Sequence, residues 1–267
     1  MNKTIFITGA SSGLGKATAK LFQSKGWNVI ATMRNIENET ELSQLENVTL
    51  LPLDVTDLGN IKSTAQKAIE LGVDVVFNNA GYGLIGPLEG LSDEQITKQF
   101  NTNLLGVLRV TKEFIPYFRE KKAGMFVTTT SIGGLIAFPM GSTYHATKWA
   151  LEGWSESLAF ELNAFGIDVK TVSPGGIKTD FMSRSIDTGS NSAYDELFGI
   201  MFQNSINMLE NSSEPIQIAE VVYEAVTDGK KQLRYVAGAD ARALYAQRLE
   251  QGDEKFRTWM GQEFLGR

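Results

Sequence analysis

The sequence predicts an α/β fold in which a doubly wound, mostly parallel seven-stranded sheet carries helices on both faces. Two observations support this. Short, apolar, β-branched runs alternate with longer segments of helical periodicity, and a glycine-rich turn directly follows the first apolar run. A chain of 267 residues is long enough for one large α/β domain but short for two. We therefore expect a single domain over residues 1–267.

The apolar runs are the expected strands. The run at 73–77 is apolar at almost every position, which is typical of a central parallel strand covered on both faces. Strands separated by helices imply right-handed βαβ units. The expected strands are residues 5–8, 27–33, 48–53, 73–77, 125–130, 167–172 and 233–236.

Start and stop signals mark the expected helices. Gly26 ends the first helix as its C′ residue. Asp57 is an expected N-cap for a helix to Leu71, and the segment 92–95 fits a capping box. Further helices are expected over 92–119, 142–165 and up to Asp228, with a helical tail from residue 239, whereas 181–211 is expected to be less regular.

Composition excludes several classes of function. A net charge of −6 and a pI near 5.0 argue against nucleic-acid binding, which needs clustered lysine and arginine. The chain has no cysteine, and its one histidine, His145, is expected to be structural or exposed, so no metal site is predicted. No apolar run is long enough to span a membrane, and Gly9 comes too early for a signal-peptide core. A cytoplasmic location is therefore expected.

A phosphate-binding turn is predicted after the first strand. Thr8 leads into glycines spaced as Gly-x-x-x-Gly-x-Gly, and a helix follows. Glycines let the backbone approach a pyrophosphate, and the helix N-terminus supplies oriented N–H groups. No lysine stands in the Walker position, so a nucleotide-hydrolysing loop is disfavoured. The turn indicates a Rossmann-type fold, with candidate cofactor contacts at Gly9, Ser11, Ser12, Gly13, Leu14 and Gly15.

The end of the second strand favours NADP(H) over NAD. An NAD site usually places an acidic residue there to bind the ribose 2′-hydroxyl. This chain has Arg34 instead and no acid before Glu37. A guanidinium can bind a 2′-phosphate through two hydrogen bonds. The alternative reading is a solvated surface arginine.

Tyr144 and Lys148 are the candidate chemical centre. They are four residues apart at the start of a predicted helix and so share one face. A neighbouring ammonium favours the phenolate and is expected to lower the tyrosine pKa from its usual value near 10. This pair alone is a weak signal. It gains weight from Ser131 at the end of the fifth strand and Asn103 inside the preceding long helix.

These residues together resemble the short-chain dehydrogenase/reductase family of the single-domain type. The resemblance runs from residue 4 to about 179. It rests on motifs in the family's order, namely Thr8-Gly9-x-x-x-Gly13-x-Gly15, Asp54-Val55, Asn78-Asn79-Ala80-Gly81, Asn103, Ser131, Tyr144-x-x-x-Lys148 and Pro174-Gly175.

The resemblance implies a role for each motif. Tyr144 would donate a proton to a carbonyl or accept one from an alcohol, and Ser131 would bind the same oxygen. Lys148 would hold the nicotinamide ribose and lower the tyrosine pKa, and Asn103 would place a water in a proton relay. The further cofactor contacts implied are Asp54 and Val55 beside the adenine, Asn79, Ala80 and Gly81 beside the fourth strand, and Pro174, Gly175, Ile177 and Thr179 at the nicotinamide end.

The resemblance also implies a homodimer or homotetramer and a substrate lid at about 181–211. Met and Phe side chains in that segment suit a bulky apolar ligand, although an ordinary packed helix is an equally good reading. Leu135, Phe138, Met140 and Tyr82 are further candidates for the pocket.

The leading hypothesis is interconversion of a carbonyl and an alcohol on a small-to-medium apolar substrate. Two alternatives remain: a catalytically idle NADP-binding sensor, and a sugar-nucleotide epimerase or dehydratase. The sensor is disfavoured because serine, tyrosine and lysine are all present, and the epimerase because the chain length barely allows its larger C-terminal domain.

Overall fold

A seven-stranded parallel sheet forms the centre of the molecule. The computed structural model describes residues 2–178, 186–210 and 212–266. The strand order is β3-β2-β1-β4-β6-β7-β9, and every pairing is parallel. The strands are β1 (Thr4–Ile7), β2 (Asn28–Met33), β3 (Val48–Pro52), β4 (Val75–Asn78), β6 (Gly124–Thr129), β7 (Ile167–Pro174) and β9 (Arg234–Ala237). The predicted doubly wound sheet is thus confirmed.

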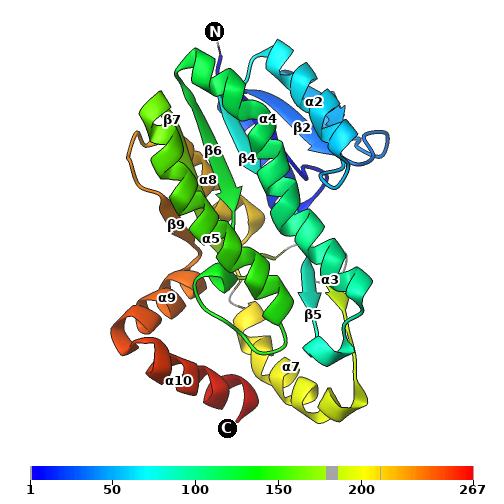
Figure 1. The fold of residues 1–267 in the computed structure, drawn as a ribbon, viewed down its shortest axis with the longest axis vertical. Coiled ribbons are helices and arrows are strands. Elements are labelled where there is room, and N and C mark those ends of the chain that lie inside the picture. Colours follow the sequence, from blue (N-terminus) through cyan, green and yellow to red (C-terminus); the bar gives the residue numbers. More distant parts are fainter. Residues whose placement is uncertain (1, 179–185, 211, 267) are drawn as a thin grey trace.

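Helices cover both faces of this sheet, and each layer has its own apolar core. One core lies under α1 (Gly13–Ser24) and α8 (Pro215–Thr227). The other lies under α2 (Leu58–Leu71), α4 (Gly106–Lys121) and α5 (Ser142–Leu162), which stand in front of the sheet in Figure 1. The residues of β1, β2, β4 and β7 are almost all buried because both faces of the sheet are covered there, whereas the edge strand β3 is half-exposed.

The helix boundaries follow the predicted capping signals. Asp57 accepts a hydrogen bond from the Asn60 amide at 2.9 Å, and Ser92 and Gln95 form the expected reciprocal capping box. Gly26 follows the end of α1 with a φ of 80°, a conformation that glycine adopts without steric cost. The predicted single helix over 92–119 is instead α3 (Asp93–Phe100), a π-helical turn at Asn101–Leu105 and α4.

The C-terminal third is more regular than expected. Within the stretch expected to be irregular lie β8 (Ile186–Thr188), which pairs with β5 (Gly83–Ile85), and α7 (Asp195–Glu210). The tail forms two helices, α9 (Ala239–Gln251) and α10 (Asp253–Leu265). In Figure 1, α7, α9 and α10 lie together beyond the end of the sheet to which β6 points.

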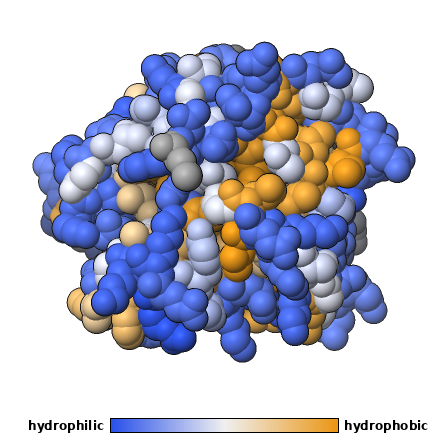
Figure 2. Space-filling view, turned by 90° about the horizontal axis from the view of Figure 1, so that it is seen from above, coloured by the Kyte–Doolittle hydropathy of each residue, from blue (hydrophilic) through white to orange (hydrophobic). Residues whose placement is uncertain are grey.

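The surface is mostly hydrophilic. Figure 2 shows one face on which hydrophobic residues gather, surrounded by hydrophilic ones. No helix in the described part of the chain combines the length and apolar character needed to cross a bilayer. Among those same residues, no cluster of His, Asp or Glu could hold a metal ion.

Candidate active site

The site lies where the strand order reverses, between β1 and β4. In open α/β sheets, ligands bind outside the carboxyl ends of the strands at this switch point. The glycine-rich turn follows β1, and the Asn79–Gly81 loop follows β4. The topology therefore brings together two motifs about 70 residues apart in the chain.

Thr8 and Asn79 tie these two loops together. The Thr8 hydroxyl accepts hydrogen bonds from the backbone amides of Asn79, at 2.9 Å, and Ala80, at 3.0 Å. The Asn79 side chain donates to the carbonyls of Thr8 and Gly9, at 3.1 and 3.2 Å. The glycine-rich turn is thereby held in one position against β4.

Two glycines in the turn have no room for a side chain. A Cβ at Gly9, where φ is 68°, would lie 2.9 Å from the Ala80 Cα. A Cβ at Gly15 would lie 2.3 Å from the Gly9 carbonyl oxygen and 2.6 Å from the Asn79 side-chain nitrogen. The glycine spacing therefore lets the turn, the loop after β4 and the start of α1 pack closely.

The N-terminus of α1 fits a phosphate. Ser12 is the N-cap residue, but its side chain accepts no capping hydrogen bond. Ser11 and Ser12 are exposed, and Gly13 is half-buried. The first-turn N–H groups and the positive end of the helix dipole are thus available to an anion. Leu14 is buried in the core under the turn and anchors the helix start.

Arg34 lies just beyond β2 and is exposed. Two acidic residues follow nearby, but neither replaces the missing NAD-type carboxylate at the strand end. Glu37 is exposed, whereas Glu39 is buried and pairs with Lys16 at 3.0 Å. Hydrogen bonds from Thr56 are the main cause that lowers the pKa of Asp54, and the charge of Arg34 adds to this effect.

Ser131, Tyr144 and Lys148 come together as predicted. Ser131 follows β6, and Tyr144 and Lys148 occupy the first two turns of α5. The Ser131 hydroxyl lies close enough to Tyr144 to favour its phenolate form. The Lys148 Nζ atom lies 5.8 Å from the centre of the Tyr144 ring and donates to the Thr129 carbonyl at 2.9 Å.

The pKa of Tyr144 is shifted in the opposite direction to the expected lowering. Burial raises the pKa of Tyr144, and the nearby Ser131 hydroxyl offsets part of that rise. Burial also lowers the pKa of Lys148 to about 8, against the opposing effect of the Glu152 carboxylate. Desolvation penalises both charged forms here, so it outweighs the attraction between phenolate and ammonium.

Asn103 lies in the π-helical turn before α4, but its side chain is already engaged. Its Nδ2 atom donates to the Tyr82 carbonyl at 2.8 Å, and its Oδ1 atom accepts from the Tyr82 amide at 3.0 Å. The side chain therefore fixes the loop after β4. A water relay at Asn103 would therefore have to use the main-chain atoms of this residue. A π-helical turn inside a helix is frequently found at a functional site.

The loop after β7 is held by a residue that the sequence did not reveal. The Gly176 amide donates to the Asp240 carboxylate at 2.8 Å, and a Cβ at Gly175 would lie 2.1 Å from the same carboxylate. Pro174 is buried at the end of β7, and Ile177 is half-buried. Thr179, the last expected cofactor contact, lies outside the described residues.

His145 is structural, one of the two roles expected for it. The buried ring accepts a hydrogen bond at Nε2 from the Phe138 amide, at 2.9 Å. Its Nδ1 atom lies 2.7 Å from the Gly133 carbonyl, so Nδ1 must carry the proton. Burial lowers the pKa of the ring. The ring thus joins α5 to the loop after Ser131.

An apolar cluster adjoins Ser131 at the carboxyl end of the sheet, and we call it the carboxyl-edge cluster. It combines the loop after β6 with α7, α9 and α10. Its buried members are Ile132, Leu135, Ile136, Met201, Ala241, Leu244, Phe256, Met260 and Phe264, with Phe138, Met140 and Phe198 partly buried against them. Several residues expected in a substrate pocket therefore do meet here, although Phe202 is exposed.

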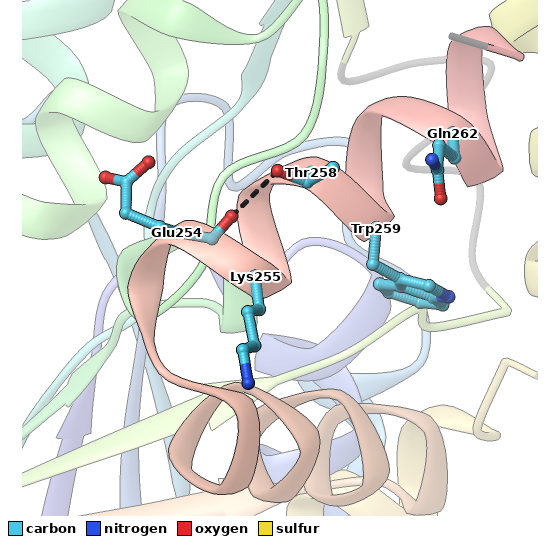
Figure 3. Close-up of a pocket in the computed structure, with 5 residues that line it drawn as sticks. All are labelled: Glu254, Lys255, Thr258, Trp259 and Gln262. Carbon is cyan, nitrogen blue, oxygen red and sulfur yellow. Dashed lines mark hydrogen bonds between the residues drawn. The ribbon is translucent and has the colours of Figure 1, made fainter.

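A depression on the outside of α10 is separate from this site. Figure 3 shows its lining by Glu254, Lys255, Thr258, Trp259 and Gln262, with Thr258 donating to the Glu254 carbonyl at 3.0 Å. All but Trp259 are exposed. Phe256, Met260 and Phe264 on the other side of α10 belong to the carboxyl-edge cluster, and Trp259 packs against it.

Sequence comparison gives a consistent match. The family model described as short chain dehydrogenase matches residues 3–189. An uncharacterized oxidoreductase of Schizosaccharomyces pombe is 40% identical over 77% of this chain and 88% of its own length. The 3-ketodihydrosphingosine reductase of Bacteroides thetaiotaomicron is 34% identical over 91% of this chain and 90% of its own.

Solved structures give the same result. A short-chain dehydrogenase from Streptomyces avermitilis has a TM-score of 0.86 and 32% identity, covering 97% of this chain and 96% of its own. ElxO with NADP bound has a TM-score of 0.77 and 27% identity, covering 91% and 100%. A 4-hydroxyisoleucine dehydrogenase complexed with NADH has a TM-score of 0.76 and 26% identity, covering 91% and 99%.

Proposed function

Because this chain belongs to the short-chain dehydrogenase family, we propose that it is an NADP(H)-dependent oxidoreductase. It interconverts a ketone or aldehyde and the matching alcohol on a small-to-medium apolar substrate. One observation carries the proposal. The neighbouring side chains of Ser131 and Tyr144, with Lys148 beside them, stand between a phosphate-binding turn and an apolar cluster.

Tyr144 is the proposed general acid and base. A nicotinamide bound in the crevice would supply or accept the hydride, which is the chemistry of that cofactor. In reduction, the Tyr144 hydroxyl gives its proton to the carbonyl oxygen as negative charge develops there. In oxidation it takes the proton from the alcohol. The Ser131 hydroxyl donates to the same oxygen and fixes its position.

Lys148 is proposed to act through its charge. Its ammonium stabilises the phenolate that Tyr144 becomes after giving up the proton, and it is placed to bind ribose hydroxyls of the cofactor. The pKa of Lys148 is about 8, so the ammonium is the major form at neutral pH. Asn103 is proposed to let this proton exchange with solvent through a water at the π-helical turn.

The proposed cofactor site uses the turn after β1, the ends of β2 and β4, and the loop after β7. The pyrophosphate would lie on the first turn of α1, whose N–H groups receive no side-chain cap from Ser12, and Gly9 and Gly15 let the turn pack closely enough to hold that position. The proposed contacts are Gly9, Ser11, Ser12, Gly13, Leu14, Gly15, Arg34, Asp54, Val55, Asn79, Ala80, Gly81, Tyr144, Lys148, Pro174, Gly175, Ile177 and Thr179.

The preference for NADP(H) rests on Arg34. Two of the similar structures differ in the cofactor that they contain, NADP in ElxO and NADH in the 4-hydroxyisoleucine dehydrogenase. A guanidinium at the end of β2, with no carboxylate competing at that position, favours a 2′-phosphate.

The Arg34→Asp variant tests this preference. A hydrogen bond between charged groups contributes about 1.5 to 3 kcal/mol, so NADPH affinity should fall roughly 10- to 150-fold. NADH affinity should stay the same or rise. Fluorescence titration of both cofactors measures this, and Arg119→Asp on the exposed end of α4 is the control. An unchanged ratio of the two affinities in Arg34→Asp would contradict the NADP(H) assignment.

The substrate class rests on the carboxyl-edge cluster, which adjoins Ser131 through Ile132. Its Met and Phe side chains suit an apolar ligand because they are large and, in the case of Met, adaptable. The relative from Bacteroides thetaiotaomicron is named as a reductase of 3-ketodihydrosphingosine, an activity on a ketone that agrees with this class.

The Tyr144→Phe variant tests the reaction. Loss of the proton donor should lower turnover about 10²- to 10⁴-fold while cofactor binding remains. NADPH consumption is followed with a panel of ketones and aldehydes, and Tyr223→Phe on α8 is the matched control. Cofactor binding by the wild type without turnover of any substrate would favour the alternative, an idle NADP sensor.

Three further parts belong to the proposal. The chain acts as one catalytic domain. The segment at about 181–211, which includes β8 and α7, is its substrate lid. The protein is a homodimer or homotetramer, supported by the exposed Trp149 and Phe160 on α5. A cytoplasmic location agrees with a chain that lacks cysteine. Light scattering measures the assembly.

A further inference from the structure

Glu152 is a buried carboxylate one helical turn after Lys148 on α5. Its side chain is 5% exposed. One oxygen accepts hydrogen bonds from the hydroxyls of Thr130, at 2.5 Å, and Ser173, at 2.8 Å. The other oxygen pairs with the Arg234 guanidinium at 2.8 Å. A buried charge is costly unless it is paired and hydrogen-bonded, and Glu152 meets both conditions.

The partners of Glu152 adjoin the proposed catalytic residues. Thr130 lies between Thr129, whose carbonyl accepts from Lys148, and Ser131. Ser173 precedes Pro174 at the nicotinamide end of the site. The carboxylate thus connects the ends of β6 and β7 to the helix that carries Tyr144 and Lys148, and Arg234 extends the connection to β9.

Charge gives this arrangement a second effect. Burial alone would drive Lys148 toward its neutral form, and the Glu152 carboxylate opposes this. The Arg234 guanidinium, from β9, lies 2.8 Å from the Glu152 carboxylate and so neutralises part of its charge. The charge at Lys148 therefore reflects a balance between a near anion and a more distant cation.

We propose that Glu152, paired with Arg234, is a positioning residue that holds the proton on Lys148 and fixes the ends of β6 and β7 around the reacting groups. This inference rests on the proposed function of Lys148. Glu152 contacts neither the substrate nor the cofactor in this role, and it acts through Lys148, Thr130 and Ser173.

The other groups around Lys148 are neutral or already engaged. Tyr144 is the second titratable group of α5 on this side, and His145 is bonded to Gly133 and Phe138. The end of β6 presents the hydroxyls of Thr130 and Ser131, and the π-helical turn presents the amide of Asn103. From α9, the Asp240 carboxylate holds the Gly176 amide. Glu156 lies on the exposed side of Arg234, 3.7 Å from it.

The test measures the pKa of Lys148 directly. The full-length protein is labelled with ¹³Cε-lysine, titrated by NMR, and the Lys148 signal is assigned by its loss in Lys148→Arg. Glu152→Gln keeps the side-chain shape and removes the anion, so the pKa of Lys148 should fall by about one unit. Arg234→Gln leaves the anion unpaired, so the pKa should rise by a similar amount. Glu156→Gln is the control and should leave it unchanged.

Opposite shifts in the two variants support the inference, because loosened packing cannot move one pKa in both directions. Unchanged values, or shifts of the same sign, overturn it. If Glu152→Gln fails to fold, as judged by circular dichroism, the rise in Arg234→Gln alone decides. The titration needs no turnover. Failure of the proposed reaction would instead appear as a wild type inactive on the whole carbonyl panel.

Kinetics provide a second readout where the wild type is active. Carbonyl reduction should decline as Lys148 loses its proton, so the alkaline limb of the kcat profile should move to lower pH in Glu152→Gln and to higher pH in Arg234→Gln. KM for NADPH should change less than kcat. Limbs that stay in place in both variants would overturn the inference.

Discussion

His145 offers a quantitative test of how the loop after Ser131 is held. The ring makes two buried hydrogen bonds, with the Gly133 carbonyl and the Phe138 amide. His145→Leu fills similar space but leaves both backbone groups without a partner. Each buried group left in this way costs about 1 to 3 kcal/mol, so the free energy of unfolding should fall by about 2 to 6 kcal/mol for the two groups together.

The pH dependence gives the same prediction an internal check. Burial lowers the pKa of folded His145 below its ordinary value of 6.5. The neutral ring is therefore favoured by folding, and its contribution is complete above pH 6.5. As pH falls below 6.5, His145 binds a proton in the unfolded chain but stays neutral in the folded protein. Stability therefore decreases until pH reaches the pKa of His145 in the folded protein.

Urea unfolding followed by tryptophan fluorescence measures both effects. The wild type should lose stability between pH 7 and pH 5, and His145→Leu should lack this His145-dependent loss. The carboxylates of Glu39, Asp54 and Asp228 have lowered pKa values, so they act below this window. Ser142→Ala, exposed on the same helix, is the control. Equal pH slopes in wild type and His145→Leu, or a loss below 0.5 kcal/mol, would refute the reasoning.

Further expectations concern the phosphate-binding turn and the buried ion pair. Gly15→Ala would place a methyl group 2.3 Å from the Gly9 carbonyl, so NADPH affinity should drop at least about tenfold; Gly153→Ala, with open space around its Cβ, should leave that affinity unchanged. Asp228 pairs with the buried Lys170 at 3.0 Å. Hydrogen bonds from the Lys230 amide and the Tyr235 hydroxyl, together with Lys170, lower the pKa of Asp228 to about 2. Asp228→Asn should therefore cost about 2 to 3 kcal/mol at neutral pH by urea unfolding. In the wild type, this stability should be lost as pH falls from 3.8 toward 2, and a variant as stable as the wild type at pH 7 would contradict the pairing.

The sequence predicted the sheet well because its signals are local. Apolar runs, the capping box at Ser92 and the N-cap at Asp57 each depend on a few neighbouring residues, and the structure confirms them. The π-helical turn at Asn101–Leu105 was not predicted, because an insertion of this kind leaves the apolar periodicity on both sides nearly unchanged. A helix in the segment of α7 was only one of two equal readings, because its apolar and polar residues lack a clear helical stripe.

Prediction of the site was limited in a different way. The sequence predicted that Ser131, Tyr144 and Lys148 lie together, because their spacing and strand position are visible in the chain. Glu152 and Asp240 were missed because their roles depend on partners far away in the sequence, Arg234 and Gly176. The predicted lowering of the Tyr144 pKa was wrong for a related reason. The charge of a neighbouring lysine can be read from the sequence, whereas the burial that raises this pKa depends on the packed structure.

The carboxyl-edge cluster has a consequence for how such a protein could change its preferred ligand. The family model ends at residue 189, yet Met201, Leu244, Phe256 and Phe264 come from beyond that point. In the proposed function, the reactive groups therefore come from the first two thirds of the chain, and much of the apolar wall comes from the last third. Substitutions in α7, α9 and α10 could alter ligand choice while leaving the turn after β1 untouched, so this terminal region is the natural place to engineer or diversify selectivity.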